Sequence, residues 1–291
     1  SLRNVSRVDL GVKIDNVVTF GVSPELNGYT NVKSSQFFAR VEEELAAIPG
    51  VTGVAASRIP LLGGSNWGTD VSVEGYKKTP DTDANARFNA VSAGYFRMLG
   101  IPVLSGREFT LGDIVGSSRV AIVNETFAKQ VSGDADPIGR YLWVEAAEGT
   151  PIKKIQIVGI SRDTKYGDIK DKFEPLVQLP VTQNSDGRAA KMLFKPRGSI
   201  DGLMPEITRR VAEVNPEISL EMSVVGKAVR DGLVRERLMA ALSGAFGVLA
   251  ALLAAVGIYG VMSYTVTRRS NEIGIRLALG AKRSRVLSMI V

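Results

Sequence analysis

The chain has 291 residues, 45% of them apolar, and its formal net charge is +6. Cysteine and histidine are both absent, which excludes disulfides, thiolate nucleophiles and every catalytic or metal site that needs imidazole or sulfur. Residues 268–291 hold six basic side chains and one acidic one, residues 238–267 hold no charge, and +1 is left for residues 1–237. The sequence therefore predicts a folded, nearly neutral body with a basic tail, and no catalytic, metal or cofactor site.

Residues 1–60 alternate between strand and helix patterns. Apolar residues recur at every second position in "DNVVTFGVSP" and again in "VTGVAASRIP", as in half-buried strands. Between them, "SSQFFARVEEELAAIPG" repeats apolar residues at helical spacing and ends at a proline. The predicted buried face of this helix consists of Phe37 or Phe38, Val41, Leu45 and Ile48.

Residues 61–188 have a different character. Short strand patterns are broken by Gly and Asp turns, and two short helices are predicted at "AGYFRMLG" and "NETFAKQV". "LLGGSNWG" lacks the spacing and the lysine of a phosphate loop, so it is predicted to be a loop at the subdomain junction, with Trp67 as a contact residue. The predicted strands are "TDVSVEGY", "ARFNAVS", "RVAIVN", "RYLWVE" and "KKIQIVGISRD". This part is predicted to be a mostly β subdomain that leaves and re-enters its host at neighbouring points.

Residues 189–225 repeat the pattern of the first half. A strand pattern, "AKMLFKPRG", precedes a helix with Met204, Ile207, Val211 and Val214 on one face, and "ISLEMSVV" is again a strand. The two βαβ halves are predicted to pack as one subdomain in a split arrangement. The predicted fold class is α+β, with an inserted β-rich subdomain and a long stalk and transmembrane helix after it.

Two acidic motifs of the body are predicted to be structural. Glu42, Glu43 and Glu44 are predicted to form the solvated face of their helix rather than a carboxylate pair. Asp134 and Asp136 precede "PIGR" and suit a turn better than a cation, because two acids without further ligands hold a hard ion poorly.

From residue 226 the pattern turns helical. Residues 226–237 contain no proline, so one helix can continue as a stalk from the last strand into residues 238–267. That uncharged run has 30 residues, where about 20 suffice to cross a bilayer. The alternative, a buried helix of a soluble domain, would normally show a polar stripe. Small residues at helical spacing are candidates for close packing against another membrane helix, although such residues are common in membrane helices in any case. They are Ala240, Gly244, Gly247 and Ala251.

The flanking charges orient this helix. Residues 227–237 hold four basic and two acidic side chains, whereas six basic residues follow the uncharged run. The positive-inside rule then places residues 268–291 in the cytoplasm and residues 1–225 outside the inner membrane, in the periplasm of a Gram-negative cell.

The tail begins with "NEIGIRLALGAKRSR". Glu272 and Arg276 are spaced to pair on a helix, while Ile273, Leu277 and Gly280 form an apolar strip. Three interpretations compete: a nucleic-acid patch, which suits a short segment beside a membrane poorly, a flank that binds lipid headgroups, and a helix that docks on a partner. The apolar strip favours the docking helix over a purely electrostatic anchor.

Longer motifs add a family resemblance. "RRSNEIGIRLALGAKRSRV", directly after a membrane helix, resembles the cytoplasmic end of the second membrane helix in the FtsX/MacB family of ABC-transporter permeases. "SLRNVSRVDLGVKIDNVVTF", "SAGYFRMLGIPVLSGREFT" and "VAIVNETFAKQ" followed by "DPIGR" are similar to the MacB-type periplasmic core domain. The resemblance covers nearly the whole chain, and it extends to permeases in which two such units are fused in tandem.

The resemblance implies a division of the chain and a set of partners. Residues 1–60 and 189–225 would form a porter-like subdomain, residues 61–188 an insertion of the kind called Sabre, and residues 226–237 the stalk. An ABC ATPase on another chain or segment would act on a coupling region in residues 268–291, with Glu272, Ile273, Arg276, Leu277 and Gly280 as contact candidates. A second permease protomer, a periplasmic partner and membrane lipid are further implied partners, as are membrane helices before and after this chain.

Three functional hypotheses follow. The leading one is a transport or mechanotransmission subunit, not itself an enzyme, that couples cytoplasmic ATP hydrolysis to periplasmic conformational change. The alternative is a membrane-anchored extracytoplasmic binding module without ATPase coupling, in which the tail only fixes topology. A membrane-tethered hydrolase that uses carboxylates ranks last. The residues do not indicate a transported substrate.

Overall fold

The computed structural model describes residues 10–22, 31–60, 62–63, 67–76, 84–131, 136–144, 153–167, 171–183, 190–216 and 222–279. The chain divides into an N-terminal unit, Ser1–Val229, and a C-terminal unit, Arg230–Val291. The described strands all belong to the N-terminal unit, and the described part of the C-terminal unit is helical.

Four strands of the N-terminal unit form an antiparallel sheet from the two βαβ halves. They are β1 (Val18–Val22), β2 (Val51–Ser57), β10 (Ala190–Pro196) and β11 (Met222–Val224). Their order is β11-β1-β10-β2, so strands from the two halves alternate across the sheet. This is the split βαβ arrangement, and it confirms the predicted α+β fold class.

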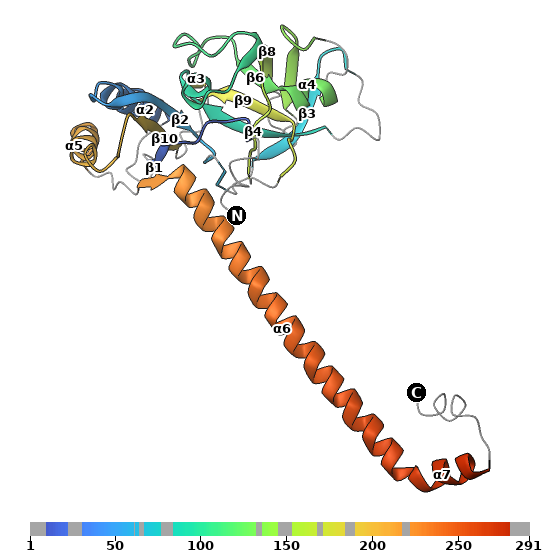
Figure 1. Cartoon of the computed structure of the whole chain (residues 1–291). Helices are drawn as coiled ribbons and strands as arrows, with labels where there is room; N and C mark the ends of the chain where they lie inside the picture. Colours follow the sequence, from blue (N-terminus) through green and yellow to red (C-terminus); the bar gives the residue numbers. More distant parts are fainter. Residues whose placement is uncertain are drawn as a thin grey trace. The chain divides into compact units, whose positions relative to one another are not determined.

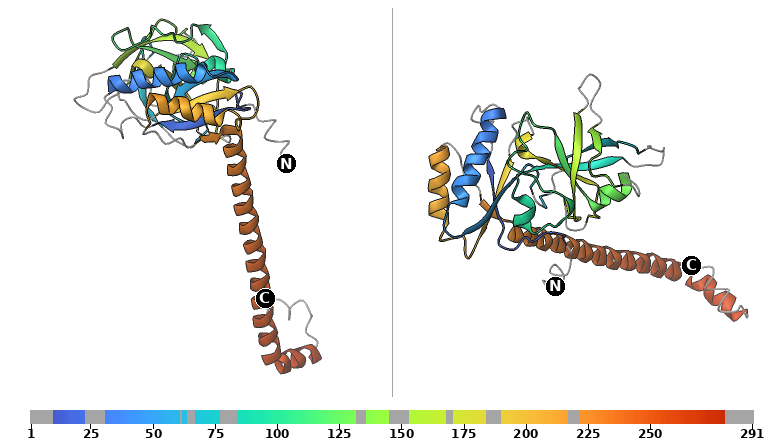
Figure 2. Two further views of the ribbon diagram at one scale, coloured as in Figure 1. Left: turned by 90° about the vertical axis from the view of Figure 1, so that its left-hand side faces the viewer. Right: turned by 90° about the horizontal axis from the view of Figure 1, so that it is seen from above.

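Helices α2 (Asn31–Ala46) and α5 (Met204–Val214) lie side by side and cover one face of this sheet (Figures 1 and 2). The apolar positions predicted for α2, from residue 37 to residue 48, are buried. They pack with Phe20 and Phe194 of the sheet, whose ring centroids lie 6.2 Å apart. The helical periodicity of the sequence therefore predicts correctly which side chains of α2 are buried.

The pairings of the insertion form a ring of six strands. They pair in the order β4-β3-β7-β8-β6-β9, and β9 pairs back with β4, so the described strands close into a barrel. Side chains from every strand meet in one buried cluster that includes Phe88, Leu142 and Ile157. The strands are β3 (Gly68–Val73), β4 (Asn85–Val91), β6 (Val120–Asn124), β7 (Tyr141–Val144), β8 (Lys153–Ser161) and β9 (Leu176–Pro180).

Short elements complete the N-terminal unit. β5 (Val103–Gly106) pairs with β8 outside the ring. Helix α3 (Tyr95–Leu99) packs on β2, and α4 (Glu125–Val131) follows β6 directly. A single 3₁₀ turn, η2 (Val181–Gln183), follows β9.

The barrel leaves and re-enters the sheet at neighbouring points. Ser57, the last residue of β2, pairs with Lys191 near the start of β10. Buried Asn89 of β4 fixes the segment in which the chain leaves β2 for the barrel. Its Oδ1 accepts the Ile59 N–H at 2.9 Å, and its Nδ2 donates to Ser57 Oγ at 3.0 Å. Buried hydrogen bonds therefore join the barrel to the sheet in addition to the chain itself.

The prediction of a solvated acidic face on α2 is wrong for Glu42. This residue is half-buried and its Oε1 is buried, and the burial raises the pKa of its carboxyl above the ordinary value. The insertion covers this side of α2, which the periodicity of the helix alone does not show. Glu43 is exposed, as predicted, and Glu44 forms a 2.7 Å ion pair with Arg210 of α5.

Asp136 has the turn role that the sequence predicts. Its Oδ1 accepts the Ile138 N–H at 2.9 Å, two residues further on. Asp134 lies outside the described residues. Within the part of the chain that the structure describes, no group of three or more acidic side chains is placed to hold a metal ion.

Candidate functional site

The longest helix, α6 (Val225–Arg268), has 44 residues and begins directly after β11. Its part from Leu238 to Arg268 contains an 18-residue stretch with a mean hydropathy of 2.2, and none of that stretch is buried. Large apolar side chains along it are exposed, for example Leu253 at 65% and Val256 at 68%. An apolar surface of this length needs lipid or other membrane helices around it.

Two threonine hydroxyls near the end of α6 are satisfied within the helix. Thr265 Oγ1 donates to the Val261 carbonyl at 2.8 Å, and Thr267 Oγ1 donates to the Ser263 carbonyl at 2.8 Å. Bonds to the carbonyl four residues back keep hydroxyl groups from facing hydrocarbon without a partner. These two threonines are therefore compatible with the bilayer, as is the length of the segment.

The four small residues predicted to pack against another helix lie on the exposed part of α6. They are Ala240, Gly244, Gly247 and Ala251, and their spacing of four, three and four residues places them on one side of the helix. A Cβ added at Gly244 or at Gly247 would meet nothing within 4 Å. The space that a close partner helix needs is present, and the packing role stays a prediction.

The predicted coupling residues fall on a separate short helix, α7 (Ser270–Ala278). It follows α6 after a single residue, Arg269, and leaves the line of α6 there (Figure 1). Glu272, Ile273, Arg276 and Leu277 belong to α7, although their side chains lie outside the described residues, and Gly280 lies outside them altogether. Two other apolar side chains of this segment, Ile275 and Leu279, are 62% and 82% exposed.

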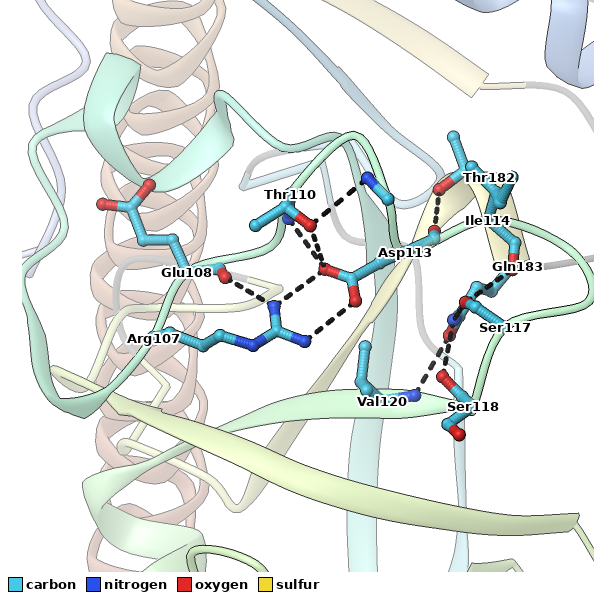
Figure 3. Close-up of polar contacts among 11 residues, drawn as sticks. Arg107, Glu108, Thr110, Asp113, Ile114, Ser117, Ser118, Val120, Thr182 and Gln183 are labelled. Atoms are coloured by element: carbon cyan, nitrogen blue, oxygen red, sulfur yellow. Dashed lines mark hydrogen bonds and ion pairs between the residues drawn. The ribbon is translucent and has the colours of Figure 1, made fainter.

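The N-terminal unit holds a feature that sequence reasoning missed: residues 107–118, here called the pinned loop (Figure 3). Its centre is the buried carboxylate of Asp113, which accepts two bonds from the Arg107 guanidinium and one each from the Thr110 N–H and hydroxyl. The Asp113 carbonyl in turn accepts the Thr182 hydroxyl at 2.6 Å. The Arg107 guanidinium holds the pKa of the Asp113 carboxyl below its ordinary value.

A second set of bonds fixes the other end of the pinned loop. Buried Gln183 accepts the Val120 N–H on its Oε1 at 3.0 Å (Figure 3). Its Nε2 donates to Ser117 Oγ at 2.8 Å and to the Ser118 carbonyl at 2.9 Å. Between the two anchor points the loop exposes three apolar side chains, Leu111 at 88%, Ile114 at 51% and Val115 at 58%. A fixed loop with exposed apolar side chains is suited to contact with another protein.

A cavity of about 90 Å³ lies at one end of the barrel. Trp67, the predicted contact residue, lines it together with Phe88, and their ring centroids are 5.4 Å apart. The Arg58 guanidinium lies over the Trp67 ring, 4.1 Å from its centroid. Trp67 is thus held in place by the barrel and by a cation, and it belongs to the cavity wall rather than to a free loop tip.

The comparisons with known proteins agree with this arrangement. Residues 6–231 match the family of MacB-like periplasmic core domains, and residues 244–291 match the FtsX-like permease C-terminal family. The chain belongs to the MacB-like periplasmic core domain family. Both matches together make it a sequence of the MacB/FtsX type of ABC transporter permease, with a MacB-like periplasmic core domain and one candidate membrane-spanning helix.

Three relatives show how far the similarity reaches. The uncharacterized ABC transporter permease YknZ of Bacillus subtilis (strain 168) is 23% identical over 249 residues, which are 85% of this chain and 59% of that protein. The macrolide export ATP-binding/permease protein MacB of Azoarcus sp. (strain BH72) is 24% identical over 218 residues, 74% of this chain and 33% of that protein. The chain thus spans less than two thirds of the length of either curated relative.

The third relative is a solved structure. The crystal structure of the periplasmic region of MacB from Actinobacillus actinomycetemcomitans has a TM-score of 0.50 and 13% sequence identity, and the match covers 77% of this chain and 94% of that chain. Similarity at this level of identity shows the fold alone.

Proposed function

We propose that this chain couples ATP hydrolysis by a partner ABC ATPase to conformational change of its periplasmic domain, for export or for mechanotransmission. The observation that supports this most is the continuity of α6, which starts at the residue after β11 and runs to Arg268 without an interruption. Its first N–H, that of Val225, donates to the Val17 carbonyl at 2.9 Å. A continuous helix transmits displacement in a way that a flexible linker does not.

In this proposal the chain has three functional parts beyond its periplasmic domain: a stalk at residues 226–237, a membrane span at residues 238–267 and a cytoplasmic coupling segment at residues 268–291. At 1.5 Å per residue, the 31 residues of the apolar segment extend about 46 Å, enough to cross a hydrocarbon core of about 30 Å. The six basic residues of the coupling segment support its cytoplasmic location and contact with lipid headgroups.

The coupling contact is assigned to α7 and the residue shortly after it, with Glu272, Ile273, Arg276, Leu277 and Gly280 facing the ATPase. Ile273 and Leu277 lie four residues apart and suit insertion into an apolar groove of the partner ATPase. Glu272 and Arg276, also four residues apart, suit the polar rim of that groove. Ala240, Gly244, Gly247 and Ala251 are assigned to contact with a further membrane helix, of the same or of a second permease protomer.

The test uses the complete permease together with its ATPase. Changing Ile273 and Leu277 together to Asp places two charges in the proposed contact and is expected to lower ATPase co-purification and permease-stimulated ATP hydrolysis at least tenfold. The matched control changes Ile275 and Leu279 together to Asp, two exposed positions of the same segment. Equal loss in both double variants, or no loss in the first, contradicts the assignment.

A second candidate function, a membrane-anchored periplasmic binding module without ATPase coupling, has one observation in its favour. The pinned loop presents Leu111, Ile114 and Val115 on a hydrogen-bonded frame, and that frame does not depend on α6 or α7. A complete permease that binds a periplasmic protein through this loop but neither binds nor stimulates any ATPase would establish this alternative.

A further inference from the structure

A second cleft of the N-terminal unit, about 50 Å³ in volume, lies between α2 and the insertion. One wall is α2, with Phe38, Ala39 and Glu42. The opposite wall comes from the pinned loop and from the end of β9, with Phe109, Leu111 and Val181 among its residues. The cleft therefore joins the sheet with its helices to the barrel, and a ligand in it would contact both parts.

The hydroxyl groups that line this cleft already have partners. Ser92 Oγ accepts the Ala56 N–H at 2.9 Å, and Thr182 Oγ1 donates to the Asp113 carbonyl at 2.6 Å (Figure 3). Thr110 Oγ1 bonds to the Asp113 carboxylate at 3.1 Å. The two threonine hydroxyls of the insertion side are thus committed to the pinned loop, whereas the Ser92 hydroxyl and the Ala56 N–H also hydrogen-bond to the Glu42 carboxyl.

The acidic group of the cleft is different. Ser92 and the Ala56 backbone hydrogen-bond to the carboxyl group of Glu42, but its Oε1 is buried and has no hydrogen-bond partner within the part of the chain that the structure describes. Among the described lining residues, no basic side chain compensates the charge of this carboxylate. A buried acceptor without a donor carries a desolvation penalty of about 1–3 kcal/mol, more for a charged group, and a cationic donor would remove that penalty most completely.

The size and walls of the cleft restrict the cation. A volume of about 50 Å³ holds roughly three or four water-sized groups, which corresponds to an ammonium group and two or three methylenes. The apolar side chains of Phe38, Phe109 and Val181 suit the methylenes, and a planar guanidinium with five donors would leave most of its donors unsatisfied there. We propose that the cleft binds a primary alkylammonium group, with Glu42 as its anionic partner and the apolar walls around its chain.

The proposal is tested with n-propylammonium chloride as the probe and the full chain in detergent micelles, by saturation-transfer NMR from protein to probe. We expect binding to the wild-type chain, at least tenfold weaker binding to Glu42→Gln, and no binding of the neutral analogue n-propanol at the same concentration. Glu43→Gln, one residue away and exposed, removes the same charge outside the cleft and should bind like the wild type. Ala39→Leu keeps Glu42 but fills the cleft, and it should also abolish binding.

A second probe distinguishes two sources of a primary ammonium group, a lysine of another protein and a free amine. Nα-acetyl-lysine methylamide presents a lysine side chain on a peptide backbone. Binding of both probes identifies the site as open to a lysine of another protein, and binding of n-propylammonium alone identifies it as a site for a free amine. No saturation transfer to either probe, equal binding of n-propanol, or equal affinity in Glu42→Gln and the wild type would overturn the proposal.

Discussion

Arg107 and Asp113 form a two-point salt bridge, with Nη1 to Oδ2 at 2.8 Å and Nη2 to Oδ1 at 2.9 Å. The Asp113 side chain is only 8% exposed, whereas that of Arg107 is 45% exposed. The same carboxylate also accepts the N–H and the hydroxyl of Thr110. One aspartate therefore organises a surface loop from the inside, and the loop presents apolar side chains outward.

Asp113→Asn should loosen the pinned loop. The amide keeps one acceptor oxygen but loses the charge and turns its other end into a donor that faces the Arg107 guanidinium. We expect a loss of about 1–3 kcal/mol in the free energy of unfolding, measured by chemical denaturation of the N-terminal unit. Asp201→Asn is the control, because exposed Asp201 bonds locally to Ser199, and it should change stability by less than about 0.5 kcal/mol.

The stability contributed by Asp113 should depend on pH in a defined direction. Because its pKa is lowered in the folded protein, the folded state binds this proton less tightly than the unfolded chain does. The contribution is therefore complete above the ordinary pKa of 3.8 and is lost as the pH falls below it, through the lowered value. Wild type and Asp113→Asn should thus converge in stability below pH 3.8, and an equal difference at all pH values would contradict the salt-bridge account.

Glu42→Gln should show the opposite dependence. Burial raises the pKa of Glu42 above its ordinary 4.5, so the folded state binds the proton more tightly and ionisation destabilises the fold as the pH rises through this range. The neutral glutamine removes that effect, and we expect a higher melting temperature than the wild type at pH 7 and no difference below pH 4.5. Glu43→Gln should leave the melting temperature unchanged at both pH values. A gain in Glu42→Gln that is equal at both would indicate a cause other than ionisation.

Gly106→Ala should destabilise the N-terminal unit more than Gly116→Ala. Both glycines have positive φ, +77° and +97°, so both substitutions carry backbone strain of about 1 kcal/mol. A Cβ at position 106 would in addition lie 2.2 Å from the Val158 carbonyl oxygen, whereas at position 116 it meets nothing within 4 Å. The Gly106 variant should lose about 2–4 kcal/mol in denaturant titrations. Similar losses in the two variants would show that the contact with β8 is not as close as described.

The membrane topology can be tested by labelling introduced cysteines, because this chain has no native cysteine that would also be labelled. Glu43→Cys and Leu279→Cys are both at exposed positions, in the N-terminal unit and just after α7 respectively. In intact spheroplasts a membrane-impermeant maleimide should label Cys at position 43, and label position 279 only after permeabilisation. The reverse pattern would contradict the orientation inferred from the flanking arginines.

The sequence predicts the individual helices and strands of this fold better than the strand pairing that closes the barrel. The buried face of α2 and the two βαβ halves follow from local periodicity, because the apolar residues concerned lie within one helix or strand. Strands β5 and β9 were not predicted: β5 has four residues and ends at Gly106, and β9 is buried along most of its length and ends at Pro180, so neither alternates clearly. The parallel pairing of β4 with β9 joins segments about 90 residues apart, and no local pattern reports it.

The candidate sites divide in the same way. The uncharged run of α6 and the basic segment after it each consist of consecutive residues, so the sequence predicts them directly. Glu42 lies beside two other glutamates in the sequence and differs from Glu43 only because the pinned loop, some 70 residues further on, covers one side of α2. The coupling role of α7 stays a prediction, because it depends on a partner ATPase.

The central claim is that α6 transmits motion as one helix, and its stalk offers the most direct measurement. In the complete permease with its ATPase, Val229, Leu233 and Val234 around Gly232 are changed together either to Ala or to Gly, where each Gly weakens the helix by about 1 kcal/mol relative to Ala. The readout is the ATP-dependent change in amide hydrogen exchange of the periplasmic domain, with ATP hydrolysis recorded in parallel. The account predicts that the Ala variant keeps this change and that the Gly variant loses it while ATP hydrolysis continues. A Gly variant that keeps the full ATP-dependent change would contradict it.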